Sequence, residues 1–242
     1  MSINPNMANR EVVNAVFCDY KTQVPFLNMD YANTSTTELT GESVFAYGGW
    51  GHPKRITYYG ERGGTIVFET QIQPFKLYSL MTGGEISTSA KIMRREELVA
   101  SQEKKLTLSA TPDGDVVNVF AANDDCGEPV ESSVSGTEVT LTSGTAGSKY
   151  IVYYLESKNS GVKKINIKNT TFPKAFTVYA ETTYKTEDDE IVPYKMVAYK
   201  VSPQSNMSIA YSNTGDPATL TLTCDLLIDG DGNMLDLILI EE

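Results

Sequence analysis

The stretch that decides the fold runs from Lys54 to Gly84 and reads KRITYYGERGGTIVFETQIQPFKLYSLMTGG. It begins with the alternation of a strand, in which Ile56 and Tyr58 share one face, and the alternation resumes over 65–72. Between the two runs lie residues 60–64 (GERGG), rich in the glycine that tolerates the positive φ of tight turns. The pattern predicts a β-hairpin with its turn at 60–64.

A short helix is predicted directly after this hairpin. Pro74 ends the second strand and suits the first turn of a helix. Apolar residues follow at helical spacing over 75–81, and Gly83 and Gly84 supply a C-terminal stop. The local unit is therefore a hairpin, a short helix and a Gly-Gly end.

Most of the remaining chain alternates with the period of strands. Strands are predicted at 11–20, 37–47, 176–184, 191–201, 207–211, 220–228 and 234–240. The run from Leu220 to Ile228 is the clearest, because apolar residues alternate strictly with Thr221, Thr223 and Asp225. The segment 87–100 fits either a strand or a helix, and residues 1–10 form a polar arm. We expect a mainly β fold, a sandwich or barrel with one short helix.

Between Lys104 and Ser157 the predicted strands become shorter and the turns between them more frequent. Short strand candidates at 106–108, 116–120, 139–141 and 150–155 are separated by turn-forming residues. Such spacing is typical of a small β-sandwich-like, Ig-like unit. Later strands are needed to close the main domain, so we expect a main β domain of residues 1–103 and 158–242, with 104–157 inserted into it.

Composition and charge exclude several classes of function. The chain has 242 residues, 40% of them apolar, and a net charge of −11, so a generic nucleic-acid binder with a basic footprint is disfavoured. Cys18, Cys126 and Cys224 match neither a disulfide framework nor a metal-ligand spacing. The N-terminus shows no secretory signal, and no apolar run is long enough for a membrane segment.

Three polar or glycine-rich segments could be mistaken for chemical sites. Residues 48–53 hold the only Trp and the only His, but they lack phosphate-loop spacing and are predicted to be a Gly-rich connection with an aromatic anchor. Residues 229–233 (DGDGN) lack the Gly and Glu that a calcium loop requires, so a hairpin turn is expected. The acidic residues 186–190 form a solvated hairpin tip. His52 has no partner motif and nucleophile signatures are absent, so we predict no enzyme, no catalytic residue, no metal and no cofactor.

Two segments resemble the tail tube proteins of bacteriophages. In those proteins a turn of the form F/Y-x-G-x-R/K-x-G joins two strands, and a short helix ends in an L-x-T-G segment. In the hairpin turn and helix the matching residues are Gly60, Arg62, Gly63, Gly64, Phe75, Leu80, Gly83 and Gly84. In the late strand and its approach they are Gly215, Asp216, Pro217, Leu220, Leu222 and Asp225. The resemblance covers about half of the chain, and the inserted unit lies outside it.

The resemblance implies a structural subunit of a phage tail tube, assembled in the host cytoplasm and located in the virion tail. Copies would form stacked, six-fold rings around a hollow conduit for DNA ejection, joined through sheet edges. DNA would pass without specific binding, and tail sheath, baseplate or tail terminator proteins are further partners. An acidic lining would repel DNA. The candidate lumen-facing residues are Glu69, Gln71, Glu181, Thr183, Thr221, Thr223 and Asp225, although a solvent-facing outer surface would give the same pattern.

The alternative is a β-sandwich virion protein or adhesin-type binding module. Loops that display Tyr and Trp can recognise a host surface protein or a glycan. Such a module would be a monomer or small oligomer, whereas a tube subunit would associate into rings.

Overall fold

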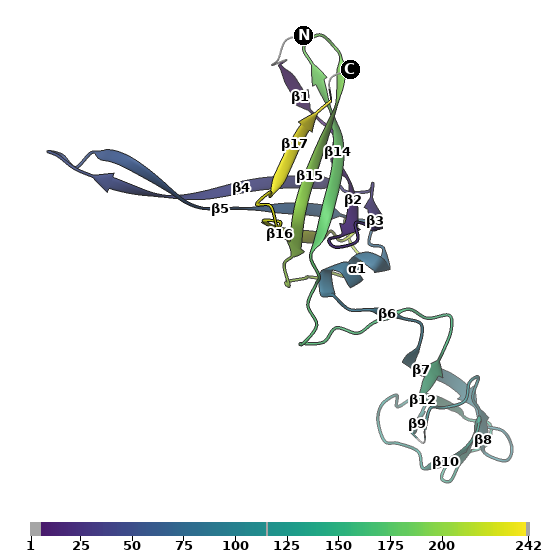
Figure 1. Ribbon diagram of the computed structural model, residues 1–242. Helices are drawn as coiled ribbons and strands as arrows, with labels where there is room; N and C mark the ends of the chain where they lie inside the picture. Colours follow the sequence, from purple (N-terminus) through teal and green to yellow (C-terminus); the bar gives the residue numbers. More distant parts are fainter. Residues whose placement is uncertain (1–5, 115, 241–242) are drawn as a thin grey trace. The chain divides into compact units, whose positions relative to one another are not determined.

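The computed structural model describes residues 6–114 and 116–240 (Figure 1). The chain is mainly β with one short helix, as the sequence predicted, and it forms two compact units. Unit 1 comprises Met1–Glu85 and Asn166–Glu242, and unit 2 comprises Ile86–Ile165. The first half of the expected polar arm (1–5) and the terminal Glu241 and Glu242 lie outside the described residues.

Unit 1 is built on one nine-stranded antiparallel sheet. Its strands are β1 (Met7–Asn9), β2 (Asn14–Asp19), β3 (Pro25–Met29), β4 (Thr34–Tyr47), β5 (Lys54–Thr70), β14 (Phe176–Thr186), β15 (Ile191–Pro203), β16 (Leu220–Leu227) and β17 (Leu235–Leu239). Their order is β3-β2-β14-β15-β16-β5-β4, with β1 paired to the far end of β14. β16 pairs with one end of β15 and β17 pairs with the part of β15 that precedes it. A turn separates β16 from β17.

The sheet folds over itself to enclose the core of unit 1. Phe17 of β2 contacts Phe68 of β5 with ring centroids 5.5 Å apart, although three strands separate β2 from β5 in the pairing order. The layer of β3, β2, β14 and β15 therefore faces the layer of β16, β5 and β4. β16 provides the corner, because it pairs with β15 at one end and with β5 at the other. Its alternation is as predicted: Leu220 and Leu222 are buried.

The predicted helix is α1 (Phe75–Thr82), which begins after Pro74 and buries Leu77 and Met81 in this core. Gly83 ends it with φ 70°, and its N–H donates to the Ser79 carbonyl at 2.9 Å. The motif residues Phe75 and Leu80 lie less deeply than Leu77. The Pro and Gly signals thus bound the helix correctly.

The predicted hairpin turn at residues 60–64 is wrong. β5 runs without interruption through Gly60, Arg62, Gly63 and Gly64, and the turn of the β4–β5 hairpin lies at 48–53. These three glycines have no positive φ. Between the pairs Gly41–Arg62 and Ser43–Tyr59 one residue of β4 faces two residues of β5, which is a β-bulge. The glycines therefore mark a bulge and a close approach within a strand.

Unit 2 has two three-stranded antiparallel sheets and a core of its own. One sheet is β7 (Ala90–Val99), β12 (Lys149–Lys158) and β9 (Val117–Ala121), in that order. The other is β10 (Ser132–Ser135), β11 (Glu138–Leu141) and β8 (Lys105–Thr107). The short pair β6 (Ile86–Ser87) and β13 (Lys164–Ile165) brings the two ends of the unit together.

The structure moves the boundaries of this unit outward, from 104–157 to 86–165. The ambiguous segment 87–100 contains β7, a strand that pairs along its whole length with β12 and so belongs to unit 2. Exposure alternates along β7, but the less exposed face includes the charged Arg94 and Glu96, so the sequence shows no alternation of apolar with polar residues. The strand predicted at 207–211 is not formed.

Candidate assembly surfaces

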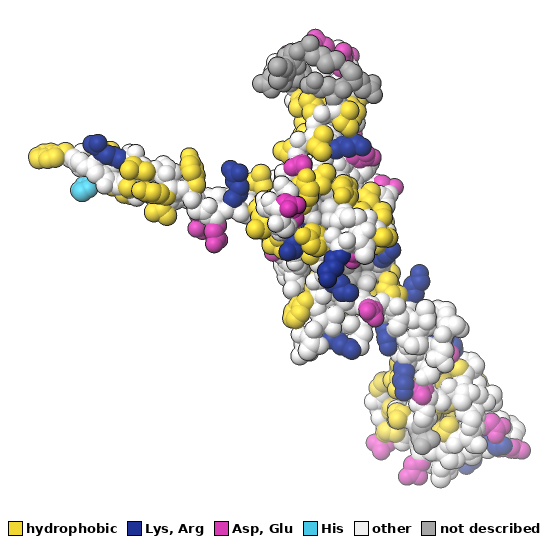
Figure 2. Space-filling model, in the orientation of Figure 1, with side chains coloured by type: hydrophobic (Ala, Val, Ile, Leu, Met, Phe, Trp, Pro, Cys, Tyr) yellow, Lys and Arg dark blue, Asp and Glu magenta, His cyan; other side chains and the backbone are white. Residues whose placement is uncertain are grey.

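The distal part of the β4–β5 hairpin forms an arm, defined here as residues 41–62. Among the described residues β4 and β5 pair only with each other within the arm, because β16, the other neighbour of β5, reaches no further than Thr65 (Figure 1). Val44 and Tyr58 are paired across the arm and are 67% and 59% exposed, and the nearby Ile56 is 54% exposed. Hydrophobic side chains follow the arm in Figure 2.

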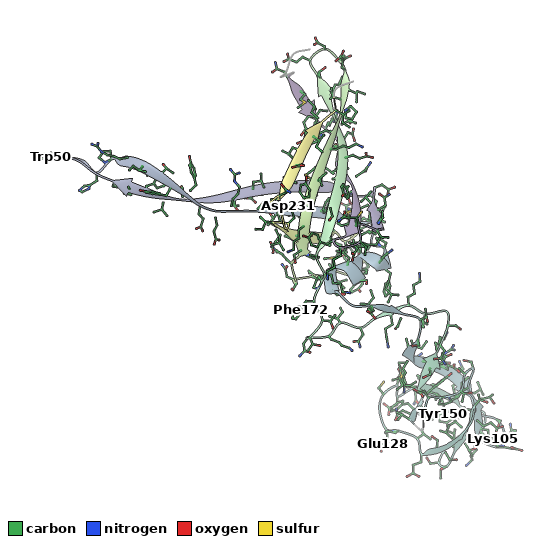
Figure 3. All side chains as sticks on the ribbon, viewed as in Figure 1. Trp50, Lys105, Glu128, Tyr150, Phe172 and Asp231 are labelled. Carbon is green, nitrogen blue, oxygen red and sulfur yellow. The ribbon has the colours of Figure 1, made fainter. Side chains whose placement is uncertain are left out.

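The tip of the arm carries the tryptophan that was predicted to be an aromatic anchor. That prediction is wrong: Trp50 projects from the tip and is fully exposed (Figure 3). Gly49 and Gly51 take positive φ in this turn, and Arg55 Nε donates to the Gly48 carbonyl at 2.9 Å. Lys54 Nζ lies 3.7 Å from the centre of the Phe45 ring. Cations and aromatic rings are thus displayed together near the tip.

An isolated two-stranded ribbon is only marginally stable in water, and large exposed apolar patches mark interaction sites. The arm combines both features, since neither of its faces is buried by the rest of unit 1. The expected one-sided burial of Ile56 and Tyr58 is therefore absent. We regard the arm as the main interaction surface of unit 1.

A polar face spans the three strands β4, β5 and β16, on the side away from the core. Registered neighbours on this face are Thr34, Thr36 and Glu38 of β4; Glu69, Val67 and Thr65 of β5; and Thr221, Thr223 and Asp225 of β16. Thr34 Oγ1 donates to Glu69 Oε2 at 2.6 Å, and Gln204 Nε2 donates to Asp225 Oδ1 at 2.8 Å. Three carboxylates and no Lys or Arg occupy these nine positions.

The seven candidate lumen residues divide between the two layers of the sheet. Glu69, Thr221, Thr223 and Asp225 lie on this polar face, and Gln71 follows the end of β5, where its N–H donates to Asn33 Oδ1 at 2.9 Å. Glu181 and Thr183 lie instead on the outer side of β14, where Glu181 is 3.9 Å from Lys195. The two groups face opposite directions. Thr34, Thr36 and Glu38 of the same face were not among the candidates, because residues 34–38 are all polar and no alternation distinguishes one face from the other.

The other motif residues have structural roles. Gly83 and Gly84 follow the helix, and the αL backbone of Gly83 lies against Phe172. Gly215 has φ 82° in an exposed loop that also holds Asp216 and Pro217. None of them joins a cluster of reactive side chains.

The DGDGN segment forms a turn, as predicted. Asp229 Oδ1 accepts N–H groups of Asp231 and Asn233 at 2.9 and 2.7 Å, and Oδ2 accepts from the Asn233 side chain at 3.1 Å. Burial would raise the pKa of Asp229, but these hydrogen bonds outweigh it and lower the pKa. Among residues 6–114 and 116–240, no three His, Cys, Asp or Glu side chains are placed to hold a metal ion. The only helix described, α1, is too short to span a membrane.

Comparison with known proteins identifies the family of this chain. No curated protein matches the chain. The sequence profile of the YomU/Tube protein family matches residues 10–237, which include both units and both segments of the resemblance noted above. The chain therefore belongs to the YomU/Tube protein family, and it is a structural protein of the phage tail tube kind.

Proposed function

We propose that this chain is the repeating subunit of a phage tail tube, which associates with other copies of itself into stacked, hexameric rings. The observation that supports this most directly is the arm. Its exposed Val44, Ile56 and Tyr58 are not covered by the described residues of unit 1, and covering them would remove apolar surface from water. Family membership makes other copies the natural source of that cover.

Sheet edges offer the lateral contacts of such a ring. In the described residues β3, β4 and β17 each pair with a single strand, so each has one free edge. Free edges are hazards in a monomer, but neighbouring subunits can use them to continue a sheet. A rotation between neighbours that closes on itself then gives a ring, whereas a contact along the axis allows stacking.

The lumen lining that fits best is the polar face of β4, β5 and β16. The carboxylates of Glu38, Glu69 and Asp225 repel phosphates, and the threonine hydroxyl groups carry no positive charge that would attract them, so DNA would pass without sticking. The outer side of β14 and β15 fits less well, because it exposes Lys195 beside Glu181. Assembly would take place in the host cytoplasm, and the finished tube would serve DNA ejection.

Electron microscopy of the purified chain tests this proposal. The wild-type chain should form rings or hollow rods, and a three-dimensional reconstruction should place Glu38 and Glu69 on the inner wall. A variant in which Asn-Gly replaces Ser43–Tyr59 keeps the core intact and should remain monomeric. A wild-type chain that stays monomeric at high concentration would contradict the tube and favour an adhesin-type module.

A further inference from the structure

A groove of about 320 Å³ opens on unit 1, on the core side of the sheet. Its lining comes from β1 and the following residues, β4, β14, β15 and β17: Asn9, Glu11, Val13, Ser35, Thr37, Leu39, Ala180, Glu181, Thr182, Tyr184, Tyr194, Met196, Leu235 and Leu237. Leu39 and Leu237 are 55% and 58% exposed, and the rings of Tyr184 and Tyr194 lie 4.9 Å apart. The groove is thus a hollowed surface in which apolar and aromatic side chains lie beside polar ones such as Asn9, Ser35 and Thr37.

The groove exists because the second layer of the sheet covers only part of the first. Near Phe17 and Phe68 the two layers meet and exclude water. Further along β14 and β15, β4 is the only strand of the second layer that lines the inner face in the described part of the chain. The core face of β14, β15 and β17 is therefore left open there.

We propose that this groove receives the arm of a second copy of the chain. This inference rests on the proposed tube function and names the surface that accepts the arm. The arm presents Val44, Ile56 and Tyr58, whose burial against Leu39 and Leu237 would cover both exposed surfaces at once. At about 25 cal/mol for each Å² of apolar surface removed from water, a contact of this kind can support a specific interface.

Charge complementarity supports the same pairing. The distal arm, residues 43–60, carries Lys54 and Arg55 and no acidic residue, in a chain whose net charge is −11. The groove lining carries Glu11 and no Lys or Arg; Glu181 also borders the groove, but its side chain lies on the outer side of β14 beside Lys195. The two cations of residues 43–60 therefore suit a groove that offers one carboxylate and no cation.

The occupant has to be a different copy. Leu39 lines the groove at the base of the molecule's own arm, where it pairs with Gly64. From that point the two strands continue outward without a break to the turn at 48–53. A paired ribbon cannot fold back on its own base without losing these pairs. Because one copy donates an arm and the next supplies a groove, the contact is heterologous and propagates from copy to copy.

The test uses two variants that each keep one half of the contact. The first replaces Ser43–Tyr59 with Asn-Gly, so it retains only the groove. The second is Leu237→Arg, which retains the arm but places a cation in the groove. Leu237 is largely exposed, so this variant should fold. Ile228→Arg is the matched control, because Ile228 is equally exposed and does not line the groove.

Light scattering with size-exclusion chromatography gives the readout. Each variant alone should be monomeric, their mixture should form a complex of one copy of each, and the Ile228→Arg control should assemble like the wild type. Leu237→Arg should weaken the arm contact about tenfold or more, as loss of a central apolar contact does. A mixture that stays monomeric, or a Leu237→Arg chain that assembles normally, would overturn the groove while leaving the tube in place. A wild-type chain that never assembles would overturn both.

Discussion

At the scale of single residues, Gly64 shows why β5 carries so many glycines. A Cβ atom at this position would lie 2.5 Å from the Glu38 carbonyl oxygen and 3.1 Å from Leu226 Cδ1. The main-chain oxygen cannot move aside without disturbing the pairing of β4 with β5. We expect Gly64→Ala to destabilise the chain by about 1–3 kcal/mol, as overpacking does. Urea unfolding of the full chain measures this change.

Gly41 on the partner strand is the matched control. A Cβ atom there would meet nothing within 4 Å, and its backbone has no positive φ. Gly41→Ala should therefore change the free energy of unfolding by no more than about 1 kcal/mol, with a gain as the expected sign. Equal losses in the two variants would show that glycine flexibility, and not close approach, is what matters in this hairpin.

The sequence could not distinguish these two uses of glycine. Gly60, Gly63 and Gly64 are compatible with a turn, a bulge or a close approach, and the choice depends on Glu38 and Leu226, which lie far away in the chain. Gly83 was different, because the helix pattern directly before it indicated that this glycine ends a helix. Local signals therefore predicted the helix end correctly and the hairpin turn incorrectly.

At the scale of elements, strands with regular alternation were predictable and the arm was not. β14 and β16 keep one phase of alternation, so their buried faces follow from the sequence. In β5 the bulge at residues 60–61 shifts the phase, and both faces of the distal half are exposed. A ribbon with both faces exposed in its own unit has no buried face that the sequence could mark by alternation. The candidates from the sequence covered the β5 and β16 parts of the polar face but not the β4 part. Which residues of β4 lie beside β5 depends on strand pairing between residues far apart in the sequence.

β7 adds a testable property, because its charged side chains are paired within unit 2. Arg94 bonds to Glu156 at 2.5 Å, and Arg95 bonds to Asp125 at 2.9 Å. The hydrogen bond from Arg95 lowers the pKa of Asp125. Burial would raise the pKa of Glu96, but hydrogen bonds, with those from Ser109 and Tyr154 the largest, outweigh it and lower that pKa. The carboxylates on or beside β7 are thus stabilised in their charged forms.

Acid should therefore destabilise unit 2. A carboxyl group with a lowered folded-state pKa contributes stability above its unfolded pKa and loses it as the pH falls through the folded value. The ordinary values are 3.8 for Asp and 4.5 for Glu, so the loss should begin near pH 4.5 and continue below it. Calorimetry of the full chain from pH 7 to pH 3 measures this dependence. The double variant Arg95→Met/Asp125→Asn should show a shallower decline, and an unchanged decline would contradict the role of the pair.

At the scale of the whole molecule, the described residues form two hydrophobic cores that have no residue in common. The core of unit 1 includes Phe17, Phe68 and Phe176, and the core of unit 2 includes Leu106 and Tyr154. The sequence showed that a second unit was inserted, since the density of turns changes, but it did not show where the unit begins. That boundary depends on the pairing of β7 with β12, from Val99 with Lys149 to Ala90 with Lys158, which joins residues 50 to 68 positions apart.

This boundary leads to a comparison of two deletions. In β6 and β13, Ile86 pairs with Ile165, so the chain ends on either side of unit 2 are neighbours and a two-residue turn can join Glu85 to Asn166. Because no core residue of unit 1 comes from unit 2, this deletion should leave a soluble chain that still assembles through its arm.

Deleting only 104–157 should behave differently. It removes most of β12 and leaves β7 unpaired, with the edges of a ten-residue strand exposed. We expect this shorter deletion to aggregate, although it removes fewer residues than the longer one. Soluble yield and light scattering of the two purified chains make the comparison. If the 104–157 deletion were the soluble one, β7 would belong to the fold of unit 1; if neither were soluble, unit 2 would be required for the folding of unit 1.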